Sequence, residues 1–258
     1  MSELVLWHFP ISHYNEKVRW ALDWKRLPHR REVRTWDYVP RAWWATGQLR
    51  LPILFIDGRA VADSTAIIAE LERLCPEPAL YPADPEARAR ALALEDFCDE
   101  ELGHAVRAAI LGPVFYEDPM AAIDALTTGM PASARRVIGA LPAGFRTFYV
   151  RRHRIDRATI AAERRKVRDG MNRIAAAVGP SGHLVGDRFT VADLTAAALL
   201  SPIAQPAELE YPLAQPLHPL MEEYRSSLAH HPALRWTVEI YRKHRGGAAT
   251  HGAAAGFS

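Results

Sequence analysis

Three side chains near the start of the chain could do chemistry together, because Ser12, His13 and Tyr14 are consecutive. They follow the apolar run LVLWHF (4–9) and precede VRWAL (18–22), where apolar residues recur at helical spacing. A hydroxyl at a strand-to-helix junction lies at a helix N-terminus, where unpaired N–H groups and the positive end of the dipole favour an anion. The spacing therefore predicts that Ser12 steadies a bound anion.

Other interpretations of the same residues stay open. Ser12 could simply cap the helix, with Asn15 and Glu16 in its first turn, and capping is compatible with catalysis. Tyr14 is the alternative hydroxyl donor. His13 is either a partner of the anion or an exposed side chain.

Elements of two kinds alternate in the first eighty residues and must position this junction. Asp57–Gly58 predicts a tight hairpin turn. A strand–helix–strand start requires parallel strands, and the hairpin adds antiparallel ones, so we expect a small mixed sheet. Strands are predicted over 4–9, 31–35, 53–57 and 59–62, and helices over 15–25, 41–45 and 64–74.

Beyond a proline-rich stretch, strand patterns nearly vanish. Short helices are expected within 112–142, and the glycine- and alanine-rich end is expected to be disordered. The predicted organisation is a domain over 1–80, a linker over 81–87, an all-helical domain over 88–245 and a tail over 246–258. Longer helices are predicted over 86–111, from before Ile160 to 178, after Thr190, over 217–227 and over 232–244.

Composition excludes several classes of protein. Hydrophobic residues make up 49% of the 258 and charged residues 24%, which is typical of a globular protein, and the formal charge of +2 argues against nucleic acid. The two cysteines have no metal-binding spacing, so no metal is expected. Residues 1–9 lack the pattern of a secretion signal and no stretch is apolar enough to cross a membrane, so the expected location is the cytoplasm.

Three stretches resemble motifs of one family: SHYNEKVRWAL (12–22), RLPILFIDGRAVADSTAII (50–68) and GDRFTVADL (186–194). They resemble the cytosolic glutathione S-transferase superfamily, in its serine or cysteine type. The resemblance implies an α/β thioredoxin-like N-terminal domain followed by an all-α helical-bundle C-terminal domain. It also implies that Ser12, seven residues before Arg19, stabilises the thiolate of bound glutathione.

The same resemblance implies the glutathione-binding residues. Leu51 would pair with the peptide backbone of glutathione because the Leu51–Pro52 bond is cis, and Arg50 would reach the glycine carboxylate. Asp63 would bind the α-ammonium group and Ser64 the neighbouring carboxylate. The structural alternatives are a trans proline that opens a strand and a Ser64 that only caps the following helix.

A second pocket, for a small hydrophobic electrophile, is implied around Tyr14, Phe115 and Tyr116. The long segment 112–157 either covers this pocket or forms a surface excursion. The Thr190–Asp193 spacing is that of a capping box, which we interpret as structural.

The expected function is therefore a glutathione transferase that joins the thiolate to an electrophile or performs a related thiol reaction. The alternatives are a glutathione-transferase-like binding protein without catalysis and an enzyme that uses another small thiol. A homodimer is also expected, with the sheet domain of one subunit against the helical domain of the other. Its contact residues would include the tryptophans Trp36, Trp43 and Trp44.

Overall fold

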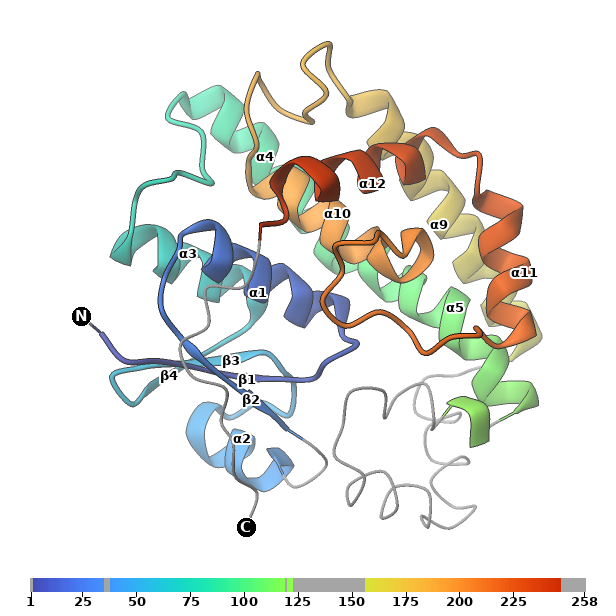
Figure 1. Ribbon diagram of the computed structural model, residues 1–258, viewed down its shortest axis with the longest axis horizontal. Helices are drawn as coiled ribbons and strands as arrows, with labels where there is room; N and C mark the ends of the chain where they lie inside the picture. Colours follow the sequence, from blue (N-terminus) through green and yellow to red (C-terminus); the bar gives the residue numbers. More distant parts are fainter. Residues whose placement is uncertain (1, 35–37, 119, 123–155, 247–258) are drawn as a thin grey trace.

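The computed structural model describes residues 2–34, 38–118, 120–122 and 156–246 (Figure 1). Its N-terminal half alternates strands and helices, as predicted. Helix α1 begins two residues before its predicted start because Ser12 caps it. In chain order the elements are β1 (Leu4–His8), α1 (His13–Trp24), β2 (Arg30–Val33), α2 (Tyr38–Thr46), β3 (Ile53–Ile56), β4 (Arg59–Ala62) and α3 (Ser64–Leu74).

The four strands form one mixed sheet in the order β2-β1-β3-β4. Strand β1 pairs in parallel with β2, Val5 lying opposite Arg30, and antiparallel with β3. The Asp57–Gly58 turn closes the β3–β4 hairpin with φ angles of 49° and 82°. Positive φ at both positions is what a tight two-residue hairpin turn requires. The predicted mixed sheet and hairpin are confirmed.

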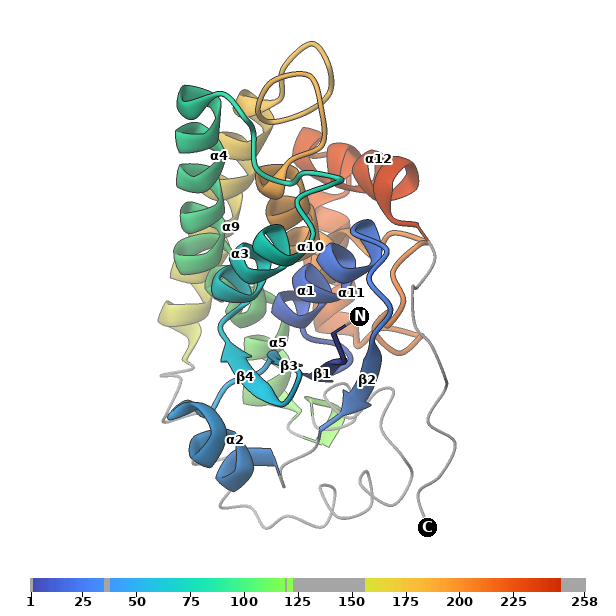
Figure 2. The same cartoon turned by 90° about the vertical axis from the view of Figure 1, so that its left-hand side faces the viewer.

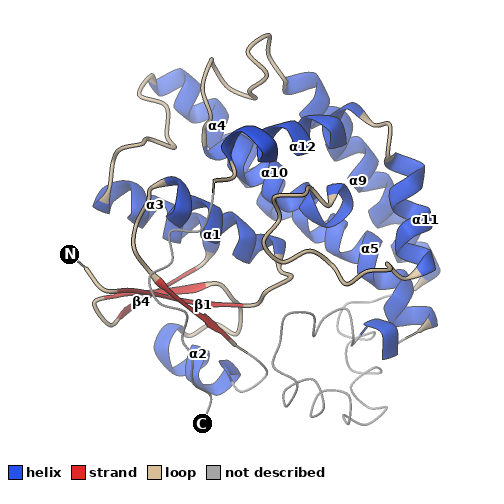
Figure 3. Cartoon of the chain, in the orientation of Figure 1, coloured by secondary structure: helices blue, strands red, loops and turns tan. Residues whose placement is uncertain are grey.

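Helices cover both faces of this sheet. Helices α1 and α3 lie on one side and α2 lies on the other (Figure 3). Ten of the twelve residues of α1 are buried, because the sheet packs on one side of this helix and the helical half of the chain packs on the other (Figure 2). The N-terminus of α1, which carries Ser12, therefore lies beside both halves.

The C-terminal half is helical over its described residues, which confirms the predicted fold class. Every residue of α10 from Val191 to Ile203 is buried, because α1, α4, α5 and α12 pack around it. One apolar core runs from Leu4 in β1 to Tyr241 in α12, so the two halves share it. The elements are α4 (Pro85–Phe97), a π-helical turn η1 (Cys98–Leu102), α5 (Gly103–Glu117), α9 (Arg157–Ala177), α10 (Val191–Ala204), α11 (Pro219–Leu228) and α12 (Pro232–His244).

The helix predicted to end at Leu111 continues to Glu117, with Gly112 and Pro113 inside it. Proline removes one backbone hydrogen bond, but Val114 and Phe115 are buried in the core, and this packing keeps the turn helical. The remainder of the predicted short-helix region lies largely outside the described residues, as do residues 247–258 of the predicted tail.

The capping box before α10 is present as predicted. Asp193 Oδ2 accepts the Thr190 backbone N–H at 2.9 Å, and its Oδ1 accepts the N–H of Leu184 at 2.8 Å. At the linker, α4 begins at Pro85, inside the predicted 81–87 segment, because Asp84 caps it.

Candidate active site

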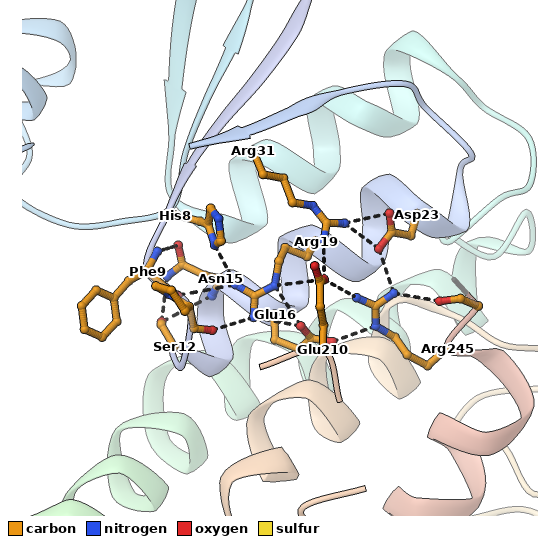
Figure 4. A network of polar contacts seen from close by, with 12 residues as sticks. His8, Phe9, Ser12, Asn15, Glu16, Arg19, Asp23, Arg31, Glu210 and Arg245 are labelled. Carbon is orange, nitrogen blue, oxygen red and sulfur yellow. Dashed lines mark hydrogen bonds and ion pairs between the residues drawn. The ribbon is translucent and has the colours of Figure 1, made fainter. Parts of the chain in front are cut away.

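Ser12 is the N-cap of α1, with φ −75° and ψ 121°. Its Oγ accepts the Asn15 backbone N–H at 3.4 Å and the Asn15 Nδ2–H at 2.7 Å, while its own N–H donates to Phe9 O at 3.2 Å (Figure 4). The hydroxyl thus serves as an acceptor twice. No residue in the described ranges accepts its proton, so the Ser12 O–H can donate to a ligand.

Asn15 holds this junction from both sides, a role beyond its predicted place in the first turn. Its Oδ1 accepts the Phe9 N–H at 3.1 Å, and its Nδ2 donates to Ser12 Oγ. One amide therefore joins the end of β1 to the hydroxyl at the start of α1.

The two rings after Ser12 point toward the helical half. Tyr14 Oη donates to Asp99 O at 2.6 Å, and burial together with the nearby Asp99 charge raises the pKa of this phenol. A Cβ at position 103 would lie 2.6 Å from Tyr14 Oη, so glycine is needed where the helix passes. The Tyr14 hydroxyl, which was the alternative donor to the anion, therefore already donates to a residue of the helical half.

His13 is buried, so of the two alternatives given for it the exposed ring is wrong. Its Nε2 lies 3.0 Å from Gly103 O, so this nitrogen is the N–H donor. Burial and, after it, the Arg107 charge lower the pKa of His13 to about 3. The ring is neutral near pH 7 and packs at the base of α5, a position that the sequence pattern does not reveal.

The predicted binding loop precedes β3. The Leu51–Pro52 bond is cis, as predicted. No described residue pairs with the backbone N–H or C=O of Leu51, so both groups are available to an extended peptide. Arg50 is exposed beside them.

Asp63 and Ser64 join β4 to α3. Asp63, not Ser64, is the N-cap, so the alternative capping role given to Ser64 is wrong: Asp63 Oδ1 accepts the N–H groups of Thr65 at 3.0 Å and Ala66 at 3.1 Å. Asp63 has φ 79°, a backbone region that non-glycine residues rarely adopt and that is found at ligand sites. Its carboxylate is exposed, whereas Ser64 is buried.

A cavity of about 360 Å³ lies between α5 and α9, with Leu111, Phe115 and Ile160 on its apolar wall. Phe115 was predicted to line the electrophile pocket. Tyr116 and Tyr14 were also predicted there but are not on its wall. Polar and charged side chains also line the cavity: Glu100, Glu101, His104, Arg107, Glu163 and Lys166.

Comparisons with known proteins agree with this geometry. The family model of the glutathione S-transferase N-terminal domain matches residues 6–79, and that of the C-terminal domain matches residues 141–232. The chain belongs to the glutathione S-transferase family. All three stretches that carried the resemblance overlap the two matched regions.

Individual relatives in this family differ in character. A glutathione S-transferase from Methylobacillus flagellatus, with GSH bound, has a TM-score of 0.63 at 18% identity, covering 93% of this chain and 95% of that one. One from Methylobacterium radiotolerans, in complex with glutathione sulfonate, has a TM-score of 0.57 at 26% identity, covering 92% and 94%. FtsZ-localized protein A from Caulobacter vibrioides is 29% identical over 115 residues, covering 42% of this chain and 50% of that protein. The match therefore covers about half the length of FtsZ-localized protein A.

Two further observations concern metal-binding groups and membrane-spanning helices. Within the described ranges, no group of three or more His, Cys, Asp or Glu is arranged to hold a metal ion. The helices in those ranges include none that is long and apolar enough to cross a membrane.

Proposed function

We propose that this glutathione S-transferase family member is an enzyme that joins glutathione to a small hydrophobic electrophile. The Ser12 hydroxyl would donate a hydrogen bond to the thiolate. The thiol proton would leave to solvent, the sulfur would form a bond to the electrophilic carbon, and the electron pair displaced there would go to a leaving group or a neighbouring atom.

The observation that carries this proposal is the hydrogen bonding of Ser12. Its Oγ already accepts two hydrogen bonds from Asn15, so the proton remains for an anion at the N-terminus of α1. A free thiol has a pKa near 8.5, and each unit of lowering corresponds to about 1.4 kcal/mol. One hydrogen bond to the anion, worth about 1.5–3 kcal/mol, supplies one or two units.

The remaining groups fit a zwitterionic tripeptide. Leu51 offers an N–H and a C=O to the peptide backbone, and exposed Arg50 offers a cation to the glycine carboxylate. Asp63 keeps one carboxylate oxygen beyond its cap contacts for the ammonium group. Ser64, first in α3, offers a hydroxyl and a helix N-terminus to the other carboxylate.

The second substrate is assigned to the cavity between α5 and α9. Its apolar wall, with Leu111 and Phe115, suits a small hydrophobic body. Two polar residues of its wall, Arg107 and His104, both lower the pKa of His13, next to Ser12.

The deciding experiment is an ultraviolet titration of the thiolate. Glutathione added to the protein at pH 7 should produce thiolate absorbance that is absent from either component alone. Retention on immobilised glutathione, without that absorbance or turnover of electrophiles, would favour a binding protein. The similarity to FtsZ-localized protein A makes this the second candidate function. Thiolate absorbance with a different small thiol and not with glutathione would favour an enzyme that uses that other thiol.

We further propose that the protein works as a homodimer in the cytoplasm, with removal of reactive electrophiles as its role. The exposed α2 tryptophans, Trp43 and Trp44, support the dimer. Trp36, the third tryptophan of that prediction, lies outside the described residues.

A further inference from the structure

The C-terminal end of α12 reaches back to α1 through one buried arginine. Arg245 directly follows α12, and its side chain is 2% exposed. Its Nε donates to Glu16 Oε1 at 2.8 Å, and its Nη1 donates to Asp23 Oδ2 at 2.8 Å (Figure 4). A residue 229 positions away in the sequence thus contacts the first turn of the helix that Ser12 caps.

Glu16 connects this contact to the loop before α1. Its second oxygen, Oε2, accepts from Arg19 Nε at 3.0 Å. The Arg19 guanidinium then donates to Pro10 O at 3.0 Å and to Phe9 O at 3.5 Å. Arg19 therefore holds two carbonyl groups of the short loop that leads to Ser12.

Phe9 completes the path. Its carbonyl also accepts the Ser12 N–H at 3.2 Å, so the same oxygen is shared by Arg19 and Ser12. We propose that Arg245 is a positioning residue for Ser12, acting through Glu16 and Arg19 on the loop between β1 and α1. This inference rests on the proposed function and extends it, because it links the end of the helical half to the thiol site.

The ion cluster along this path is balanced in charge. His8 adds none, since burial and Arg19 lower its pKa to about 2. Among the described residues, other titratable groups beside the cluster are Tyr211, whose ring lies 4.8 Å from the Arg19 guanidinium, and His29, which accepts from Arg31 Nε at 2.9 Å. Tyr241 lies close enough to Glu16 for that charge to act on its pKa, and His13 lies on the other side with Arg107 and His104 behind it. The cluster itself consists of three cations and three anions: Arg19, Arg31, Arg245, Glu16, Asp23 and Glu210.

Removal of one member of the cluster should shift the pKa of the bound thiol, and the direction of the shift depends on the charge that is removed. Without Arg245, Glu16 keeps its ion pair with Arg19 and Asp23 keeps its ion pair with Arg31. The cluster as a whole then carries one net negative charge, which disfavours a thiolate at Ser12. Without the Glu210 carboxylate, the excess charge is positive and favours the thiolate. A role limited to fastening the two halves together would lower stability in both variants and would leave the thiol pKa unchanged.

The experiment titrates the thiolate absorbance of the glutathione complex of the full-length protein. Arg245→Met should raise the pKa of the bound thiol by about half a unit or more, with a corresponding threefold or larger fall in turnover at pH 7. Glu210→Gln should lower that pKa. The KM for glutathione should change less than kcat in both, because neither residue contacts the Arg50–Pro52 or Asp63–Ser64 segments.

Two variants serve as controls. Arg245→Lys keeps the charge and loses the two-pronged geometry, so its thiol pKa should lie between those of wild type and Arg245→Met. Arg242→Met removes the same charge from the exposed face of α12, where Arg242 pairs with Glu239, and should leave the thiol pKa unchanged. Amide exchange at Ser12 in the ligand-free protein should be faster in Arg245→Met than in Arg242→Met.

The outcomes separate this inference from the proposed function. Shifts of opposite sign in Arg245→Met and Glu210→Gln support it. An unchanged thiol pKa, or shifts of the same sign, overturns it even if melting temperatures fall. If Arg245→Met does not fold, the test requires a raised thiol pKa in Arg245→Lys and a lowered one in Glu210→Gln. A wild type without thiolate absorbance overturns the proposed function, and the amide exchange at Ser12 then decides whether Arg245 positions the loop.

Discussion

Asn15 Nδ2 donates to Ser12 Oγ across 2.7 Å, and no other side-chain hydrogen bond to this hydroxyl is seen in the described part of the chain. An amide N–H can only donate, so the serine oxygen is fixed as an acceptor and its own proton is directed elsewhere. The hydroxyl is thereby prepared as a donor before any ligand binds, which reduces the reorganisation that catalysis would otherwise require.

Ser12→Ala should raise the pKa of the bound thiol by about one unit or more, the size of one lost hydrogen bond to an anion. Turnover at neutral pH should fall about tenfold and partly recover in alkali, while glutathione affinity changes less. Tyr14→Phe should leave the thiol pKa unchanged, because the Tyr14 hydroxyl donates to Asp99 O. A raised thiol pKa in Tyr14→Phe, with none in Ser12→Ala, would instead make Tyr14 the donor to the thiolate.

Asn15→Ala should reproduce part of the rise in thiol pKa seen in Ser12→Ala. Without the hydrogen bond from Asn15, the Ser12 hydroxyl rotates more freely and points at the sulfur for less of the time. In a double-mutant cycle, Asn15→Ala should add little further shift to Ser12→Ala. Additive shifts would mean that Asn15 acts on the thiol by itself.

Asp63 combines a structural contact with a proposed binding contact, and two substitutions separate them. Asn is as good an N-cap as Asp, so Asp63→Asn should leave thermal stability nearly unchanged and weaken glutathione binding about tenfold. Asp63→Ala should weaken binding similarly and also lose about 1 kcal/mol of stability. Calorimetric titration and thermal melting measure the two effects. Full affinity in Asp63→Asn would remove this residue from the ammonium site.

The buried ring of His13 predicts a loss of stability in acid. Its pKa is lowered from 6.5 to about 3 in the folded protein, so below pH 6.5 the unfolded state binds a proton that the folded state does not. This contribution is present above pH 6.5 and is lost progressively between 6.5 and 3. His13→Gln, which keeps a donor for Gly103 O, should reduce the stability lost between pH 7 and pH 5 by about 2 kcal/mol. Exposed His230→Gln is the matched control and should give the wild-type difference in chemical denaturation.

The dimer proposal predicts that the protein has twice the monomer mass in light scattering at micromolar concentration. Trp43 and Trp44 are 60% and 92% exposed on α2, which is unusual for rings of this size. Replacing both with serine should therefore weaken the dimer. Val238→Ser, at an exposed apolar position on α12, should leave it intact. A wild-type monomer at these concentrations would contradict the proposal.

The sequence predicted elements best where a local signal marks both ends. Helices α3 and α12 have the predicted bounds, because a capping residue or proline starts each and the apolar period stops cleanly. The extension of α5 through Gly112 and Pro113 could not be predicted, since tertiary packing of Phe115 overrides two residues that usually break helices.

In the candidate site, too, the positions of residues could be predicted from the sequence, whereas contacts between distant segments could not. The local pattern placed Ser12 at the start of a helix, and the family resemblance placed Leu51 and Asp63 at the junctions before β3 and α3, where the structure has them. The contacts of His13 and Tyr14 depend on Gly103 and Asp99, about ninety residues away, and no local pattern records such a pairing. Arg245 was missed for the same reason, because it was predicted only as the end of the helical domain.

The shared core has a consequence for how this protein can be recombined with its relatives. Trp20 of α1 donates its indole N–H to His244 O and packs against the rings of Phe189 and Tyr241. A chimera joined at the linker would inherit one half of this contact from each parent, so its success depends on matching positions 189, 241 and 245 to α1. Exchange of the N-terminal half alone should therefore give poorly soluble hybrids, and co-transfer of those three positions should restore them.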